Sequence, residues 1–268
     1  TNTSTVTVAL TESNLNDNTP AFGAGSYSFT YAENQTAGAV LGTVSASDAD
    51  LADTVTYSIT GGDPNGWFQI NAAGEISLTT AGAASLANDY EVLANTRNLT
   101  VQASDGTNTS TVTVALTESN LNDNAPVFGA GSYSFTYAEN QTAGAVLGTV
   151  SASDADLADT VTYSITGGDP NGWFQINAAG EISLTTAGAA SLANDYEVLA
   201  NTRNLTVQAS DGTNTSTVTV ALTESNLNDN TPAFGAGSYS FTYAENQTAG
   251  AVLGTVSASD ADLADTVT

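Results

Sequence analysis

Carboxylate and amide side chains are the groups of this sequence best able to bind a ligand, and they recur in short motifs. One residue separates Asp48 from Asp50 and Asp89 from Glu91, and Asp123 lies between two asparagines. Residues two apart in an extended chain point to the same face, so the Asp-x-Asp pair presents two carboxylates together. Oxygen ligands without nitrogen or sulfur donors are typical of Ca²⁺, which takes about six to eight oxygens. These motifs therefore predict calcium binding.

The composition excludes several other functions. The 28 Asp and Glu residues face only two cations, Arg97 and Arg203, which gives a net charge of -26, and there is no His or Cys. Such a surface repels phosphate backbones and anionic lipid, so we expect no nucleic-acid partner and no direct membrane insertion. The commonest general bases and nucleophiles are missing, so we expect no enzyme.

A repeat of 106 residues organises the chain. The segment that begins at Thr1 returns at Thr107 and Thr213, and the first two copies differ only in Thr19 against Ala125 and Ala21 against Val127. Each full copy contains 11 acidic residues, and the third copy, cut at Thr268, contains 6. A unit of this length is typical of one independent domain. Near-identical copies favour a spacer, because binding arrays usually diversify their units.

Seven short runs of alternating apolar and polar residues indicate strands within each copy. Residues 81–88 are expected to form a loop or a short helix. We therefore predict an all-β fold class of tandem seven-stranded antiparallel Greek-key β-sandwiches in a linear array. In the first complete domain the expected strands lie around residues 27–31, 40–44, 55–59, 68–70, 76–78, 99–103 and 112–116.

Proline residues that follow Asn-Asp-Asn predict where the domains meet, since proline ends a strand and keeps the preceding residue extended. The expected parts are the terminal strand of a truncated preceding repeat, two complete domains and the start of a truncated third. No signal peptide and no apolar run near 20 residues is present, so we expect a soluble window internal to a larger protein. These four parts span residues 1–16, 17–122, 123–228 and 229–268.

The acidic residues are expected to gather at the two ends of each sandwich, because alternate turns fall at opposite ends. Glu33 is expected at one end, and Asp48, Asp50 and Asp105 at the other. The remaining carboxylates are interpreted as a solubilising surface, and Trp67 as a packing residue rather than a sugar platform. The solubilising group comprises Glu12, Asp53, Asp63 and Glu75.

Five motifs in order resemble the cadherin repeat and together cover the 106-residue unit. They are Ala-Glu-Asn, Asp-Ala-Asp, Asp-Tyr-Glu, Ala-Ser-Asp-Gly and Leu-Asn-Asp-Asn-x-Pro. Exact tandem copies with so few cations also resemble the extender regions of giant calcium-dependent, RTX-type bacterial surface adhesins. The first resemblance implies Ca²⁺ shared between successive domains and their linker. The second implies an extracellular position on a bacterial cell surface.

The resemblance implies about three Ca²⁺ per complete junction, held by ligands from the upstream domain, the linker and the downstream domain. Two departures concern Asn120, where the family usually has Asp, and Asn88, where it usually has Leu. The first junction has only its downstream half, comprising Asn16, Asp17, Asn18, Asp48, Asp50 and Asp105. The complete junction comprises Glu33, Asp89, Glu91, Asn122, Asp123, the Asn124 carbonyl, Asp154, Asp156 and Asp211. The last comprises Glu139, Asp195, Glu197, Asn228, Asp229, Asn230, Asp260 and Asp262.

Two functions remain open at this stage. The first is a calcium-stiffened spacer of a cell-surface adhesin, in which neighbouring repeats are each other's partners and the chain is a monomeric elongated rod. The alternative is that the repeats are themselves adhesive and bind partner domains or glycans. The near-identity of the copies and the single Trp in each full copy favour the spacer.

Overall fold

The computed structural model describes residues 1–50, 53–156, 159–262 and 266–268. The chain divides into two compact units, Thr1–Leu121 and Asn122–Thr268. No helix among the described residues is long and apolar enough to cross a membrane.

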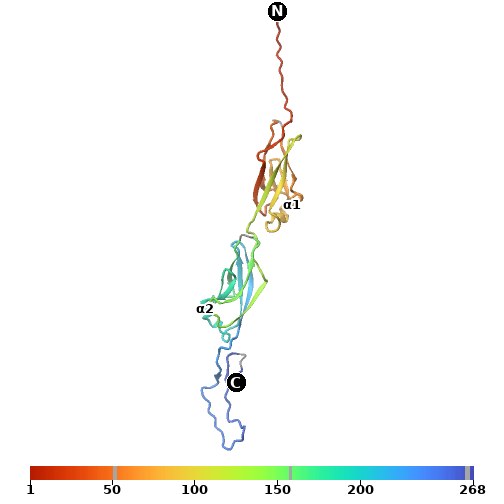
Figure 1. Ribbon diagram of the computed structural model, residues 1–268. Coiled ribbons are helices and arrows are strands. Elements are labelled where there is room, and N and C mark those ends of the chain that lie inside the picture. Colours follow the sequence, from red (N-terminus) through yellow and green to blue (C-terminus); the bar gives the residue numbers. More distant parts are fainter. Residues whose placement is uncertain (51–52, 157–158, 263–265) are drawn as a thin grey trace. The chain divides into compact units, whose positions relative to one another are not determined.

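Among its described residues, the first unit contains nine strands, one α-helical turn and one 3-10 turn (Figure 1). The helical turns α1 (Thr80–Ala83) and η1 (Leu86–Asn88) occupy the region expected to be a loop or short helix. The strands are β1 (Ala21–Phe22), β2 (Ser26–Ala32), β3 (Val40–Thr43), β4 (Ala46–Ser47), β5 (Thr56–Gly61), β6 (Phe68–Ile70), β7 (Glu75–Leu78), β8 (Thr96–Ser104) and β9 (Thr109–Ser119).

The second unit repeats these elements and ends in two further short strands. Its helical turns are α2 (Thr186–Ala189) and η2 (Leu192–Asn194). Its strands are β10 (Val127–Phe128), β11 (Ser132–Ala138), β12 (Val146–Thr149), β13 (Ala152–Ser153), β14 (Thr162–Gly167), β15 (Phe174–Ile176), β16 (Glu181–Leu184), β17 (Thr202–Ser210), β18 (Thr215–Ser225), β19 (Ala233–Phe234) and β20 (Ala258–Ser259).

Two main sheets form the sandwich of the first domain. One sheet has the order β2-β9-β8-β5 and the other β3-β7-β6, while β1 pairs with β4. All seven expected strands and the sandwich class are confirmed, and β1 and β4 are added to them. One pairing differs from the expected antiparallel pattern, because β2 runs parallel to β9. Alternation fixes which residues face inward but not strand direction, so the sequence could not show that the first and last strands run together.

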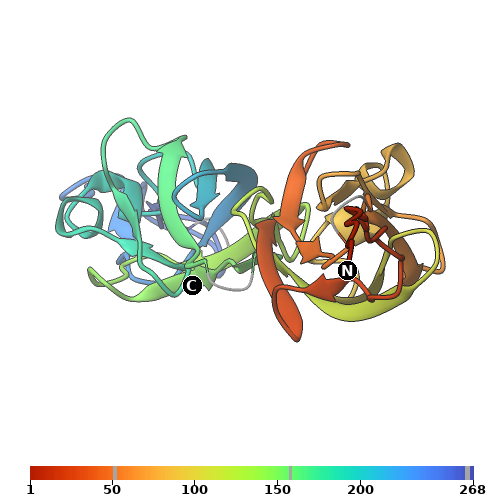
Figure 2. The same ribbon diagram turned by 90° about the horizontal axis from the view of Figure 1, so that it is seen from above.

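The core lies between these sheets, and Figure 2 shows the ribbon of each domain seen from its end. Leu99 and Val101 of β8 and Val114 and Leu116 of β9 are fully buried, and their outward neighbours are exposed or half-buried. Trp67 packs against this core, which confirms its interpretation as a packing residue. The β-branched and leucine side chains therefore form these strands because alternation buries them on one face.

Identical sequences adopt different structures at the start of the chain. Residues 3–13 have the same sequence as β9, yet residues 1–16 contain no strand and are almost entirely exposed. In the first domain β9 is stabilised by β2 and β8, which pair with it on either side. Among the described residues no strand pairs with residues 1–16, so this sequence forms a strand where neighbouring strands pair with it.

Replacing buried Leu99 by Ala should destabilise the first domain by about 2 to 5 kcal/mol through lost burial and a residual cavity. The wild type should unfold in a single urea transition, because its two complete domains are nearly identical. The variant should show two transitions, one for the altered first domain and one for the unaltered second domain. Leu86→Ala is the matched control, because Leu86 is 62% exposed. A Leu99→Ala curve that superimposes on the Leu86→Ala curve would contradict the assigned core.

Candidate metal centres

Asp50 organises one end of the first domain. Its side chain is 4% exposed, and Oδ2 accepts hydrogen bonds from the backbone N–H groups of Asp17 (3.1 Å) and Asn18 (2.8 Å). Asp48 Oδ1 accepts the N–H of Asp50 at 2.9 Å. The bonds from Asn18, the backbone N–H first, lower the pKa of Asp50 despite its burial. This end therefore holds the linker and the Asp-x-Asp pair together, as the sequence predicts.

A third carboxylate joins this pair. Asp48, Asp50 and Asp53 each place an oxygen within 4.8 Å of the others. Asp48 Oδ2 and Asp53 Oδ2 are buried, with no hydrogen-bond partner within the described part of the chain. Burial, followed by repulsion from Asp50, raises the pKa of Asp53. The interpretation of Asp53 as a solubilising residue missed this position, because the hydrogen bond from the Asp53 N–H to the Asp50 carbonyl brings Asp53 next to the pair.

Asp105 completes this end of the domain through its own loop. Its Oδ1 accepts the N–H groups of Thr107 and Asn108, each at 2.6 Å. The Asn108 amide in turn donates to Asn16 Oδ1 (3.0 Å) and the Asn18 carbonyl (2.8 Å). Burial raises the pKa of Asp105, but the backbone N–H bonds from Asn108 and Thr107 outweigh it, so the pKa is lowered. The predicted ligands from the linker, Asp-x-Asp and Asp105 are thus brought together.

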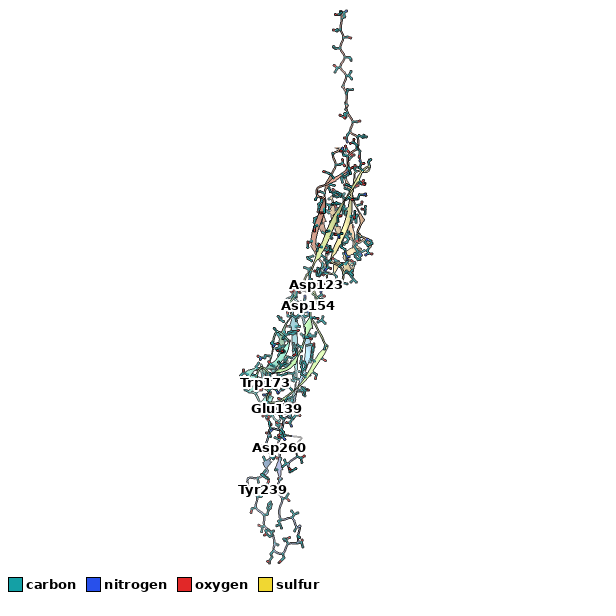
Figure 3. All side chains as sticks on the ribbon, in the orientation of Figure 1. Asp123, Glu139, Asp154, Trp173, Tyr239 and Asp260 are labelled. Carbon is teal, nitrogen blue, oxygen red and sulfur yellow. The ribbon has the colours of Figure 1, made fainter. Side chains whose placement is uncertain are left out.

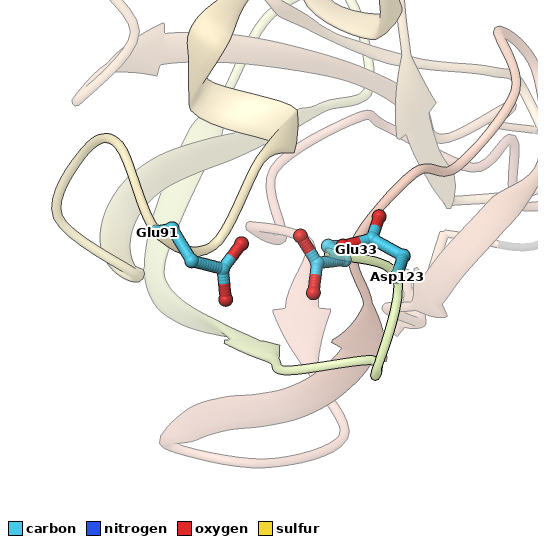
Figure 4. Close-up of side chains that lie close together, drawn as sticks. All are labelled: Glu33, Glu91 and Asp123. Carbon is cyan, nitrogen blue, oxygen red and sulfur yellow. The ribbon is translucent and has the colours of Figure 1, made fainter. Parts of the chain in front are cut away.

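Glu33 organises the opposite end of the first domain. Its side chain is 1% exposed, with Oε1 accepting the N–H of Leu121 (2.6 Å) and Oε2 that of Tyr90 (2.7 Å). Glu91 places a carboxylate oxygen within 4.8 Å of a Glu33 oxygen. Figure 4 shows both carboxylates. Asp89, two residues before Glu91 in the chain, follows η1 directly as its C-cap.

The second domain repeats both ends. Asp156 is 1% exposed and accepts the Asn124 N–H at 2.9 Å, and Asp154 Oδ1 accepts the Asp156 N–H at 3.0 Å. Asp123 accepts a bond from the Asn124 amide at 2.9 Å. Figure 3 places Asp154 and Glu139 at opposite ends of this domain, as the sequence predicts. Asp211 accepts the N–H groups of Thr213 and Asn214, and the Asn214 amide donates to Asn122 Oδ1 at 3.0 Å.

The end of the second domain opposite Asp154 brings together carboxylates from three parts of the sequence. Glu139, Asp195 and Glu197 form one group with oxygens within 4.8 Å of one another, and Glu197, Asp229 and Asp262 form another. Glu197 is thus shared between the groups, and its pKa is raised by burial and then by Glu139.

The linker of this second unit is bonded to both sides. The Asn230 N–H donates to Asp262 Oδ2 at 2.9 Å, and its amide to Glu197 Oε2 at 3.3 Å. The Asp262 N–H donates to Asp260 Oδ1 at 3.1 Å. Asn228 is exposed in the same linker.

Glu118 is a buried acidic residue that sequence reasoning did not single out. It is 3% exposed, at an inward position of β9, and its Oε1 has no hydrogen-bond partner among the described residues. Burial, then repulsion from Glu33, raises its pKa to about 7, although Arg97 acts in the opposite direction. The Arg97 guanidinium stacks over Trp67 at 5.2 Å. The sequence did contain a sign of this burial, because Glu118 continues the alternating positions of Val112, Val114 and Leu116, which face the core.

The comparisons with known proteins identify the family. The cadherin-domain family model matches residues 27–117 and 133–223. The chain belongs to the cadherin family. It is 36% identical over 255 residues to human protocadherin Fat 4, covering 92% of this chain and 5% of that protein. It is 32% identical to human protocadherin Fat 1, covering 97% of this chain and 6% of that protein. The chain therefore spans only about a twentieth of these relatives.

Solved cadherin structures share the fold. The crystal structure of mouse cadherin-23 EC22-24 has a TM-score of 0.71 and 29% identity, covering 92% of this chain and 79% of that chain. Human protocadherin-24 EC1-2 has a TM-score of 0.65 and 28% identity, covering 80% of this chain and all of that chain. These relatives are cell-adhesion proteins from animals, and no catalytic family is among the matches that identify this chain.

The residues at these ends fit calcium, which cadherin domains typically bind at the junctions between domains. The clustered ligands are all oxygens, which Ca²⁺ prefers. Buried carboxylate oxygens that have no donor among the described residues, such as Asp48 Oδ2 and Asp53 Oδ2, are costly unless a cation or other partner satisfies them. When bound, calcium supplies positive charge to these oxygens. The protein's own contribution is to orient them through the backbone N–H groups described above.

Without calcium, the stability of these domains should fall as pH rises from about 4.5 to about 7. Glu118 has its ordinary pKa of 4.5 when unfolded and about 7 when folded, so the unfolded chain ionises first and is favoured. The expected loss is about 1 to 3 kcal/mol per domain. Glu118→Gln with Glu224→Gln should remove most of it, measured by urea denaturation in chelator at pH 5 and pH 8. Equal pH slopes for the wild type and the variant would contradict the raised pKa.

Proposed function

We propose that these repeats are calcium-stiffened spacers of a cell-surface adhesin. The observation that carries the proposal is the convergence of Glu197, Asp229 and Asp262 within the second unit. These residues come from a complete domain, the linker that follows it and the next copy of the repeat. A cation bound by all three links a domain, its linker and its neighbour.

Electrostatics supports a change in stiffness with calcium. Like charges held a few ångströms apart repel, and the raised pKa values of Glu197 and Asp53 have carboxylate neighbours among their causes. In the absence of a cation, this repulsion favours a linker that moves away from the domain ends. Calcium reverses the sign of the interaction, so the linker and both domains share ligands and the junction stiffens.

We propose domains spanning 17–122 and 123–228, with about three Ca²⁺ at each complete junction. Because the copies are nearly identical, the arrangement at the end of the second domain supports the same assignment for the first. The proposed ligands at the junction between the two complete domains are Glu33, Asp89 and Glu91, followed by Asn122, Asp123 and the Asn124 carbonyl, and then Asp154, Asp156 and Asp211. The last junction uses Glu139, Asp195, Glu197, Asn228, Asp229, Asn230, Asp260 and Asp262, and the first uses Asn16, Asp17, Asn18, Asp48, Asp50 and Asp105.

The repetition itself supports a spacer rather than a recognition surface. The two full copies differ at only two positions, 19/125 and 21/127, so they offer nearly the same surface twice. Extracellular calcium-binding modules bind at about 10⁻⁴ to 10⁻³ M, which matches an extracellular position. We extend the proposal to a monomeric rod in a giant bacterial surface adhesin, supported by the copy-like repetition, while the relatives found are animal proteins.

Calcium titration by calorimetry tests the proposal. The full chain should bind several ions in the range of about 10⁻⁴ to 10⁻³ M. Asp156→Asn should abolish calcium binding at the junction between the two complete domains, or weaken it by at least about tenfold. The reason is that it removes a shared, buried carboxylate. Glu12→Gln is the matched control, since it also removes one negative charge but from an exposed residue outside the clusters.

The result that supports the proposal is a lower stoichiometry for Asp156→Asn with unchanged binding for Glu12→Gln. Equal binding by the two variants would show that calcium is attracted only by net charge. No heat and no saturation in the millimolar range would exclude calcium as the ligand.

A further inference from the structure

Three oxygen atoms at one end of the first domain meet at a single amide nitrogen. Asn108 Nδ2 lies 3.0 Å from Asn16 Oδ1, 2.8 Å from the Asn18 carbonyl oxygen and 3.4 Å from Asp105 Oδ2. These oxygens come from the linker before the domain and from the loop after β8. Each belongs to the predicted calcium ligands, whereas Asn108 does not. The amide thus bonds to ligand atoms separated by about 90 residues in the chain.

The backbone of Asn108 is fixed independently of this amide. Its N–H donates to Asp105 Oδ1 at 2.6 Å, and its carbonyl accepts the Asp105 N–H at 3.3 Å. Gly106 between them has φ of +99°, a left-handed conformation that glycine adopts without strain. The Asn108 side chain therefore projects from an anchored turn at the start of β9.

The linker is also held from its other side. Asp50 accepts the N–H groups of Asp17 and Asn18, while Asn108 donates to the oxygens of Asn16 and Asn18. An acceptor on one side and a donor on the other specify the linker conformation. Neither contact requires an ion.

The second domain reproduces the arrangement. Asn214 Nδ2 lies 3.0 Å from Asn122 Oδ1 and 2.9 Å from the Asn124 carbonyl oxygen. Its backbone N–H donates to Asp211 Oδ1 at 2.6 Å.

We propose that Asn108 and Asn214 are positioning residues that hold the linker oxygens of each calcium site together before the ion binds. The amide supplies two N–H donors where several acceptors would otherwise face one another. On calcium binding, the ion takes over the task of holding these oxygens. The proposal rests on the proposed calcium function for its second part, while the ion-free part stands on the hydrogen bonds alone.

Hydrogen exchange of the full chain tests the ion-free part. In chelator, Asn108→Ala with Asn214→Ala should speed exchange of the Asn18 and Asn124 amides about tenfold, because their linkers lose one of two anchors. At saturating calcium the change should be less than about twofold. Thr107→Ala with Thr213→Ala is the matched control, since it shortens exposed neighbours and keeps their backbone N–H groups.

Unchanged exchange of Asn18 and Asn124 in chelator would overturn the proposal. Equal acceleration with and without calcium would also overturn it, since that result would assign Asn108 and Asn214 to general stability of the turn. If the wild type binds no calcium at all, the proposed function fails, and the measurement in chelator still decides the role of these amides.

Aspartate at the same positions provides a test with opposite signs. Asn108→Asp with Asn214→Asp replaces a donor by a carboxylate, so exchange in chelator should be faster than in the alanine variant. The same carboxylate adds an oxygen ligand, so calcium should bind at least about threefold more tightly than in the wild type. Weaker calcium binding by the aspartate variant would contradict an amide placed among ligand oxygens.

Discussion

Repulsion among carboxylates held at the ends of each domain is the constraint on which this structure depends. The chain has 28 acidic residues and two cations, so its own side chains cannot neutralise the clusters. The fold nevertheless brings Asp48, Asp50 and Asp53 within 4.8 Å, and does the same for Glu197, Asp229 and Asp262. Hydrogen bonds from backbone N–H groups fix several of these carboxylates in place. The arrangement is costly without a cation and is well suited to one.

The sandwich serves this arrangement by separating the two kinds of acidic cluster. Strands β2 and β9 run side by side in the same direction, so both lead toward the end where Glu33 accepts the Leu121 N–H. The loop after β8 leads to the opposite end, where Asp105 and Asp50 lie with the preceding linker. Each domain can therefore provide an upstream set of ligands at one end and a downstream set at the other.

Alternation was sufficient to predict the strands, the buried face and the sandwich class, because each depends on local pattern. The grouping of Asp48 with Asp50 also followed from spacing alone. Strand direction did not follow, since alternation is the same in either direction. Residues 3–13 and β9 show the limit most clearly, because one sequence is a strand only where β2 and β8 pair with it.

The additional site residues depend on contacts that spacing does not encode. Asp53 joins Asp50 through a backbone hydrogen bond, and Asn108 meets Asn18 across about 90 residues of sequence. Glu118 continues an apolar alternation with a charged residue, so its burial conflicts with its type and could have been questioned from the sequence. The role of Asn108 becomes visible only when the long-range pairing of the linker and the β8–β9 loop is known.

The most direct test of the account is the distance distribution between two spin labels, one on each complete domain. The chain has no cysteine, so Ser58→Cys and Ser164→Cys place labels uniquely at exposed, equivalent positions of β5 and β14. Double electron–electron resonance should give a broad distance distribution in chelator and a single narrow one at millimolar calcium. Distributions of the same width in both conditions would contradict calcium-dependent stiffening.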